Sequence, residues 1–274
     1  MPNHVTNQIT VTGPAESLAA FRAALLVPGE ADSYGRDDLP QVIVDFNGIL
    51  PMPASLHLES GSATYRAEIW NALADDLPIA SEEAAKLYCI DRIRELTAGH
   101  LDWETATVGR LKEVFGQHPG LAEQCGLDLH YAEQIKRNIE LYGSPTWYEW
   151  CNRNWGTKWN AYHQHIGYLD EGELYLEFDT AWSPPEPVYE AIAERFPDLQ
   201  LEIRYIDEGG GFAGTYEIKD GILYDHPCSD EEFRMFAEEH FGWDYSEDDD
   251  EEWGRPDRLP ESRRRELLQR RNSV

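Results

Sequence analysis

The hydrophobic residues of this chain change their spacing twice, and this change limits the folds that it can adopt. Near the start, Val5, Ile9 and Val11 alternate with polar residues, which is the period-two pattern of a half-buried β-strand. Apolar residues of 15–27 then recur at helical spacing, and the stretch QVIVDFNGIL (41–50) predicts a second strand. The chain therefore opens as strand, helix and strand.

From about residue 63 to residue 155 the spacing becomes helical. The successive helical segments are interrupted at Gly99, at Pro119-Gly120 and at Gly143–Pro145, and these residue types commonly end helices. We expect this block to form several short amphipathic helices.

After Trp159 the period-two pattern returns, in ELYLEFDTAW (173–182) and again in LQLEIRYI (199–206). Between them, Ser183-Pro184-Pro185-Glu186 has the form of a capping box with proline at the first helical position, so we predict a helix there. Asp220-Gly221 then predicts a hairpin turn between two final strands.

This order of elements favours an α+β fold of the ferredoxin-like type. In such a fold a split β-α-β arrangement forms an antiparallel sheet with helices on one face. Because neither half of the pattern has enough strands to close a core alone, we predict one composite domain over residues 1–224. The helical block, at about 63–155, would be an insertion into it.

The chain is strongly acidic. Its 274 residues include 52 Asp and Glu against 23 Lys and Arg, a net charge of −29. Such a surface repels nucleic acid and anionic membranes, so a basic or nucleic-acid-binding protein is the more plausible partner. Residues 225–261 hold 15 acidic and 3 basic residues, and residues 262–274 hold five Arg against one Glu. We predict that 225–274 form a mobile acidic and then basic tail.

Other features bound the location and chemistry of the protein. No apolar run is long enough to span a bilayer, and the first residues lack the pattern of a secretory signal. The four cysteines are scattered, without a CxxC pair, so we expect a reduced protein in a bacterial cytoplasm. No catalytic or cofactor motif is present, and Gly209–Gly211 does not have the context of a phosphate loop. We therefore predict no cofactor and favour a non-enzymatic role.

Four segments together resemble a known family. They are MPNHVTNQITVTG at the start, ILPMP at 49–53, WGTKWNAY at 155–162 and TAWSPPEPV at 180–188. In this order they are similar to the YubB-like ferredoxin-domain family of plasmid and phage proteins, over roughly residues 1–218. The resemblance implies a ferredoxin-like fold and a mobile-element origin, and it implies no catalytic residues.

The segment WGTKWN is the best candidate for a small-ligand or partner site. Its residues, with a further tryptophan downstream, offer aromatic, hydroxyl, amide and ammonium groups: Trp155, Thr157, Lys158, Trp159, Asn160 and Trp182. Such groups can bind a flat or anionic ligand by stacking and a single charge. The alternative is that the tryptophans fill a gap in the core and have no ligand.

Histidines provide a weaker candidate. His163 and His165 have the spacing of two metal ligands on one face of a strand, but no third ligand is close in sequence. His130 and Glu133 lie one helical turn apart without a partner motif. We therefore do not predict a metal site from the sequence.

Two functions remain open. The first is an interaction protein of a mobile element whose carboxylates stand in for DNA phosphates on the binding surface of a host protein. Candidate acidic surface residues are Asp75, Asp76, Glu82 and Glu83. The second is a small-ligand or nucleotide-binding module, with or without enzymatic activity, built around WGTKWN.

Overall fold

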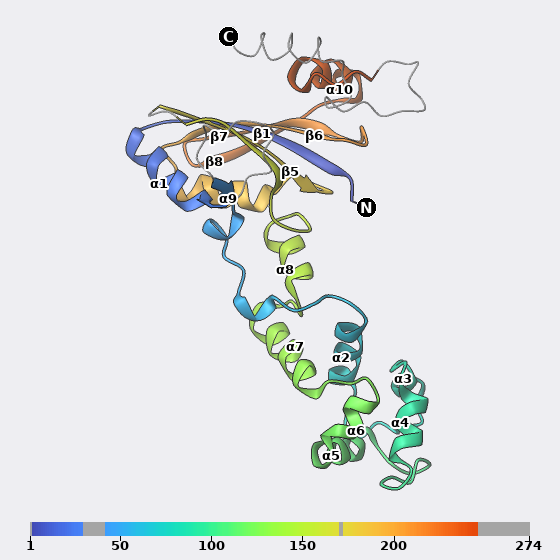
Figure 1. The fold of residues 1–274 in the computed structure, drawn as a ribbon. Helices are drawn as coiled ribbons and strands as arrows, with labels where there is room; N and C mark the ends of the chain where they lie inside the picture. Colours follow the sequence, from blue (N-terminus) through green and yellow to red (C-terminus); the bar gives the residue numbers. More distant parts are fainter. Residues whose placement is uncertain (1, 30–41, 170–171, 246–274) are drawn as a thin grey trace. The chain divides into compact units, whose positions relative to one another are not determined.

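A computed structural model describes residues 2–29, 42–169 and 172–245, which form parts of two compact units. We call Met1–Pro51 with Cys151–Val274 the sheet unit, and Met52–Trp150 the helical unit. The chain leaves the sheet unit after Pro51 and returns to it at Cys151, within a helix (Figure 1).

The described part of the sheet unit consists mainly of strands. Its elements, in chain order, are β1 (His4–Thr12), α1 (Ala15–Leu25), β2 (Leu26–Pro28), β3 (Val42–Val44), the 3-10 helix η1 (Phe46–Gly48), β4 (Tyr162–Leu169), β5 (Glu173–Ala181), α9 (Glu186–Arg195), β6 (Gln200–Asp207), β7 (Ala213–Lys219), β8 (Ile222–Pro227), α10 (Asp230–Phe236) and the π-helical turn η3 (Ala237–Phe241).

Six of these strands form one antiparallel sheet in the order β4-β5-β1-β6-β7-β8. Helices α1 and α9 lie on one face, and α10 lies on the other (Figure 1). The arrangement β1-α1-β4 followed by β5-α9-β6 is the split β-α-β pattern, with β1 between β5 and β6. The predicted α+β, ferredoxin-like class is confirmed.

The second strand of this pattern differs from the prediction. We expected it at 41–50, but only Val42–Val44 are extended there, and they pair with β2 in a separate two-stranded sheet. The strand after α1 in the main sheet is β4, which follows the helical unit. The VIV run is too short to cross the sheet, and side-chain hydrogen bonds from Gln164 on β4 connect it to the main sheet instead.

The core beneath β1 combines apolar packing with one polar network. Val5, Ile9 and Val11 are buried on the same face of β1 as the amide of Asn7. This amide donates to the carbonyl oxygen of Val5 at 2.9 Å and to the hydroxyl of Thr180 at 3.0 Å, and it accepts from the hydroxyl of Tyr189 at 2.9 Å. Because each buried polar group has a partner, the network fixes β1, β5 and α9 at little cost.

The helical unit contains short helices, as the breaks in the sequence predicted. They are η2 (Ala54–Leu56), α2 (Ser62–Ala72), α3 (Glu82–Ala85), α4 (Ile90–Thr97), α5 (Val108–Gln117), α6 (Pro119–Gln124), α7 (Leu129–Tyr142) and the start of α8 (Trp147–Asn154). Ser81, Thr107 and Asp128 cap α3, α5 and α7 by accepting backbone N–H bonds. Buried side chains from most of these helices form its core, among them Trp70, Ile93, Leu111, Phe115 and Ile135, together with Leu87 between α3 and α4.

The predicted mobile tail begins too early. Residues 225–245 complete β8 and form α10 and η3, and α10 starts with a capping box between Ser229 and Glu232. Ala237, Phe241 and Trp243 are buried against Ile206 and Ala213 of the sheet. A few apolar residues among many acidic ones are enough to hold this segment on the sheet. Residues 246–274, the rest of the predicted tail, lie outside the described residues.

Within the described residues, no helix combines the length and the apolar character needed to cross a membrane.

Candidate functional site

The first tryptophan of WGTKWN belongs to the core. Trp155 is only 3% exposed, its ring lies edge-on to that of Phe46, and its indole N–H donates to the carbonyl oxygen of Leu50 at 2.9 Å. Its polar group is therefore satisfied by the backbone, and its rings are not available to a ligand at the surface.

The next two residues join WGTKWN to the TAWSPPEPV segment. Gly156 has a φ of +75°, and a Cβ there would lie 2.6 Å from Cδ of Pro187, so only glycine fits. The buried hydroxyl of Thr157 hydrogen-bonds the backbone of Ala181. Two of the four segments that carried the family resemblance thus pack on each other.

Ser183 does not cap α9 as predicted. The helix begins at Glu186 after Pro185, and no side chain caps it. The hydroxyl of Ser183 instead donates to the carbonyl oxygen of Gly156, and its own carbonyl accepts from Thr180 at 2.8 Å. Ser183 therefore bonds to the WGTKWN segment and not to the N-terminus of α9.

The other four candidate residues, three in WGTKWN and Trp182 downstream, are partly accessible. The ammonium of Lys158 lies 4.4 Å from the centre of the half-buried Trp159 ring. Asn160 is occupied by the chain itself, since it accepts from the N–H of Phe46 at 3.0 Å and donates to Asp45 at 2.7 Å. Trp182 is 53% exposed and has a φ of +74°, which is rare for a bulky residue.

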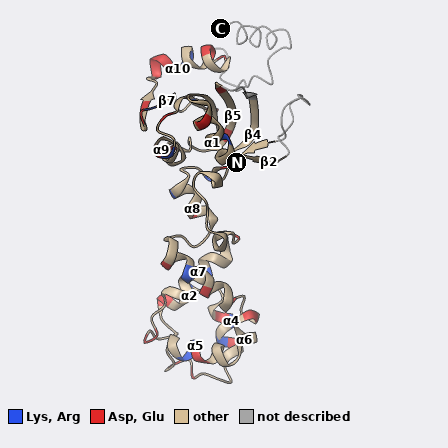
Figure 2. Ribbon diagram, turned by 90° about the vertical axis from the view of Figure 1, so that its left-hand side faces the viewer, with Lys and Arg blue, Asp and Glu red and all other residues tan. Residues whose placement is uncertain are grey.

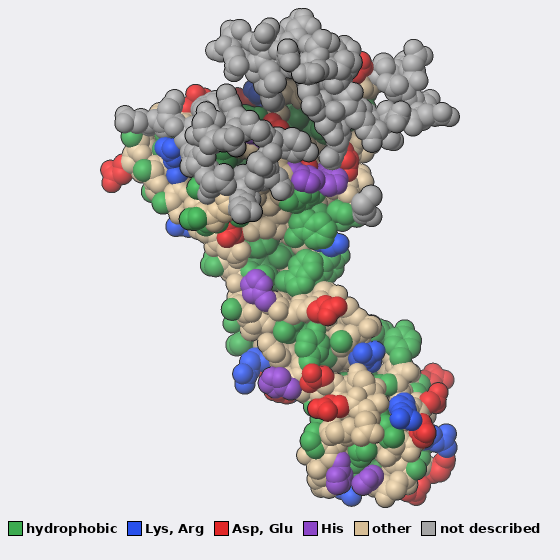
Figure 3. All heavy atoms as spheres, viewed as in Figure 1, with side chains coloured by type: hydrophobic (Ala, Val, Ile, Leu, Met, Phe, Trp, Pro, Cys, Tyr) green, Lys and Arg blue, Asp and Glu red, His purple; other side chains and the backbone are tan. Residues whose placement is uncertain are grey.

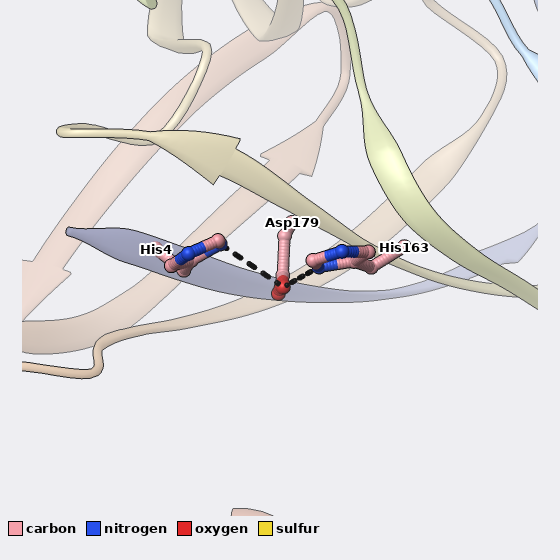
Figure 4. A group of neighbouring side chains, drawn as sticks. All are labelled: His4, His163 and Asp179. Atoms are coloured by element: carbon pink, nitrogen blue, oxygen red, sulfur yellow. Dashed lines mark hydrogen bonds and ion pairs between the residues drawn. The ribbon is translucent and has the colours of Figure 1, made fainter. Parts of the chain in front are cut away.

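A cluster of two histidines and one aspartate lies on the sheet face opposite α1 and α9. We call His4 of β1, His163 of β4 and Asp179 of β5 the histidine cluster, and Figure 4 shows both imidazoles directed at the carboxylate. Nδ1 of His163 is 2.9 Å from Oδ2 of Asp179, and Nδ1 of His4 is 3.7 Å from the same oxygen. Histidine side chains are visible at the surface of the sheet unit in Figure 3.

A β-bulge in β4 creates this cluster. The register with β5 shifts between Tyr162, which pairs with Asp179, and His165, which pairs with Glu177. His163 adopts a φ of +49° in the bulge and reaches Asp179, while Gln164 is buried and bonds to β3. The Tyr162 ring packs edge-on against the imidazoles of both cluster histidines.

Sequence spacing therefore suggested the wrong partner for His163. Its neighbours in space are His4 and Asp179, which are 159 and 16 residues away, whereas His165 is not in the cluster. His130 and Glu133 are exposed on α7, and within the described residues they have no third ligand group near them. The alternation of polar and apolar residues along β4 does not reveal the bulge between Tyr162 and His165.

Among the described residues, the strongest concentration of negative charge lies elsewhere in the sheet unit. Within 200–245, ten acidic side chains are exposed against only two basic ones, Lys219 and Arg234. The ten are Glu202, Glu217, Asp220, Asp225, Asp230, Glu231, Glu232, Glu238, Glu239 and Asp244. We call the exposed acidic residues of α10 and η3, together with the paired Glu202 and Glu217 on the same side of the sheet, the C-terminal acidic face, and Figure 2 shows acidic residues along α10.

Neighbouring groups change the ionisation of this region. The backbone N–H and the hydroxyl of Ser229 donate to Glu232 and lower the pKa of its carboxyl, which keeps it charged. Burial, with Arg204 nearby, lowers the pKa of His240 and favours its neutral form. On the other face, burial raises the pKa of Tyr205 and Tyr216, which donate to Asp225 and Glu186.

The acidic residues singled out from the sequence lie in the helical unit and are all exposed. Asp75 and Asp76 follow α2, and Glu82 and Glu83 form the first turn of α3. The carboxylate of Asp75 is 2.7 Å from the ammonium of Lys112. With 16 acidic and 8 basic residues, the helical unit carries its charges mixed, so these four do not form the most acidic surface.

Residues 154–254 match a family model described as the ferredoxin-like domain in Api92-like protein. The match covers the segment from the end of α8 through η3, and it confirms the ferredoxin-like expectation for the second half of the sheet unit. The more specific resemblance to YubB-like proteins stays a prediction.

Among solved structures, the chain is similar to a protein api92 from Yersinia pseudotuberculosis. The two are 12% identical with a TM-score of 0.37, over 84% of this chain and 99% of that chain. No curated protein matches the sequence.

Proposed function

We propose that this chain is a non-enzymatic interaction protein whose C-terminal acidic face occupies the nucleic-acid-binding surface of a basic partner protein. The observation that carries the proposal is the ratio of ten exposed acidic to two exposed basic side chains over 200–245. Carboxylates of this density can stand in for phosphates, which follow each other every ~1.7 Å along duplex DNA. The resemblance to plasmid and phage proteins suggests a partner in a bacterial host.

The packing of η3 on the sheet supports this proposal. Ala237, Phe241 and Trp243 hold the α10–η3 segment on the sheet, so its carboxylates are presented by a fixed surface. A fixed arrangement of charge loses less conformational entropy on binding than a mobile tail does. This acidic face therefore suits selective binding as well as long-range attraction.

The test is competition with DNA for basic proteins. Bacterial proteins retained on heparin are passed over the immobilised full chain, with and without duplex DNA as competitor. We expect a specific protein to be retained, to be released by the DNA, and to bind less tightly as salt rises from low to moderate concentration. Retention that neither DNA nor salt reduces would exclude phosphate mimicry.

Matched charge reversals show which surface acts. Glu231→Lys with Glu238→Lys changes the C-terminal acidic face, and Glu82→Lys with Glu83→Lys makes the same change of net charge in the helical unit. We expect the first pair to weaken binding more than the second. Equal effects would mean that net charge, and not this face, attracts the partner.

A small-ligand module remains the second candidate, with Trp182 as the observation in its favour. This side chain is exposed in a strained backbone conformation, which is unusual for tryptophan without a functional constraint. Half of the proposed platform is used inside the protein, because Trp155 and Thr157 are buried and Asn160 bonds to Phe46 and Asp45. This candidate now depends on Lys158, Trp159 and Trp182. Quenching of tryptophan fluorescence by ATP or GTP, lost in Trp182→Ala, would support it.

A further inference from the structure

We propose that His4, His163 and Asp179 bind one divalent transition-metal ion of the zinc class. The three side chains come from three neighbouring strands, and one possible ligand atom of each lies within 4.8 Å of the other two (Figure 4). This site is separate from the C-terminal acidic face and does not depend on the function proposed above.

The ligand atoms have suitable chemistry and spacing. Two imidazole nitrogens and one carboxylate oxygen are common ligands for zinc and for related first-row ions. Two ligands at ~2.1 Å from a tetrahedral ion lie roughly 3.4 Å apart. The distances to Oδ2 of Asp179, 2.9 Å from His163 and 3.7 Å from His4, lie on either side of this value. Small side-chain rotations would therefore suffice.

The groups around the cluster orient its ligands. Nδ1 of His4 is buried and, among the described residues, has no hydrogen-bond partner, although it faces Asp179. Its Nε2 lies 3.7 Å from Oε1 of Glu208, the oxygen that accepts the backbone N–H of His4. A small movement of the imidazole would form the carboxylate–histidine hydrogen bond frequently found behind metal ligands. The hydroxyl of Thr6 donates to Oδ1 of Asp179 at 2.8 Å, which leaves Oδ2 directed at the histidines.

The backbone of His163 provides an independent argument. A φ of +49° is uncommon for a residue other than glycine, and it brings a free-energy cost. The bulge that requires it serves to direct the imidazole at Asp179, since His163 would otherwise follow the strand alternation. An ion bound by this imidazole would offset that cost.

Without an ion, the same residues would still form a hydrogen-bonded link between β1, β4 and β5. The two roles differ in measurable ways. A link alone gives no stoichiometric uptake of metal, whereas a metal site binds one ion per chain and makes its affinity depend on all three side chains.

The experiment uses the full, untagged chain, freed of metal and titrated with Co²⁺ and then with Zn²⁺. We expect one Co²⁺ per chain with visible absorption bands of a nitrogen- and oxygen-bound ion, displacement by Zn²⁺, a Kd tighter than about 10 µM, and a rise in melting temperature. A folded wild-type chain that takes up less than half an equivalent of either ion under these conditions would overturn the proposal.

Variants identify the ligands. His4→Ala and His163→Ala should each abolish the cobalt bands, and Glu208→Gln should weaken binding roughly 10–100-fold. His165→Ala, on the same strand, and His226→Ala, on β8, are matched controls that should leave binding unchanged. Asp179→Asn should also abolish the cobalt bands. If this variant does not fold, His163→Ala still tests the assignment, because the His163 side chain is 49% exposed and its loss should leave the fold intact. Unchanged binding in His163→Ala, or an equal loss in His165→Ala, would contradict the assignment.

Discussion

The hydroxyl of Thr157 donates to the carbonyl oxygen of Ala181 at 2.9 Å and accepts from the N–H of the same residue at 3.0 Å. Ala181 is the last residue of β5, and its other neighbour in the sheet is His4 of β1. Thr157 therefore takes the place of a strand partner where β5 ends. This contact joins WGTKWN to TAWSPPEPV.

Replacing Thr157 tests this contact. Thr157→Val keeps the shape of the side chain but leaves two buried backbone groups without partners, so we expect the free energy of unfolding to fall by about 1–3 kcal/mol. Thr157→Ser keeps the hydroxyl and should cost less. Urea unfolding of the two variants measures the difference, and equal losses would show that packing alone matters at this position.

The two tryptophans of WGTKWN should differ in their effect on stability. Trp155→Ala removes a buried ring and its hydrogen bond to Leu50, and we expect a loss of about 3–5 kcal/mol. Trp159→Ala removes a half-buried ring and should cost clearly less. Thermal melts of both variants check this order. A similar loss in the two would mean that Trp159 also supports the core.

Truncations locate the end of the folded part. Deleting 246–274 should leave the melting temperature nearly unchanged, because the buried contacts of Ala237, Phe241 and Trp243 remain. Deleting 225–274 removes these contacts and exposes Ile206 and Ala213, so the melting temperature should fall. If the two truncated chains have the same melting temperature, α10 adds no stability and the folded part ends near Tyr224, as the sequence predicted.

Acid should weaken the α10–η3 segment through His240. Burial, and then the charge of Arg204, lower the pKa of this imidazole below its ordinary value, so the unfolded chain takes up a proton more readily. The stabilising contribution is therefore present above pH ~6.5 and is lost as the pH falls through the lowered pKa. Melting temperatures between pH 7.5 and pH 5 should fall more for the wild type than for His240→Gln. Parallel curves would contradict this.

The pattern of hydrophobic residues was enough to predict the class of fold. Period-two segments found β1, β5 and β6, and Asp220 and Gly221, both with positive φ, form the predicted hairpin turn. The pattern failed where neighbours distant in sequence decided the outcome. Val42–Val44 form a strand that joins β2, and Ser183 bonds to Gly156 and does not cap α9. Local propensity cannot show such contacts.

The candidate sites were less predictable than the fold. WGTKWN was noticed for its aromatic and polar groups, but Trp155 and Thr157 use those groups inside the protein. His163 was noticed too, and it was paired with His165 because a strand without a bulge was assumed. The partnership with Asp179 and His4 depends on the order of the strands, which a single sequence does not reveal.

The central place of β1 also has a consequence for synthesis on the ribosome. Both strands that flank β1 are encoded on the order of 160–200 residues later, so β1 leaves the exit tunnel long before either partner exists. At ~5–20 residues per second this delay amounts to roughly 10–40 seconds. During that time the helical unit can already form from local contacts, whereas β1 remains an amphipathic segment without a strand partner on either edge. Chaperones that bind extended apolar segments should therefore meet the nascent chain at its first dozen residues.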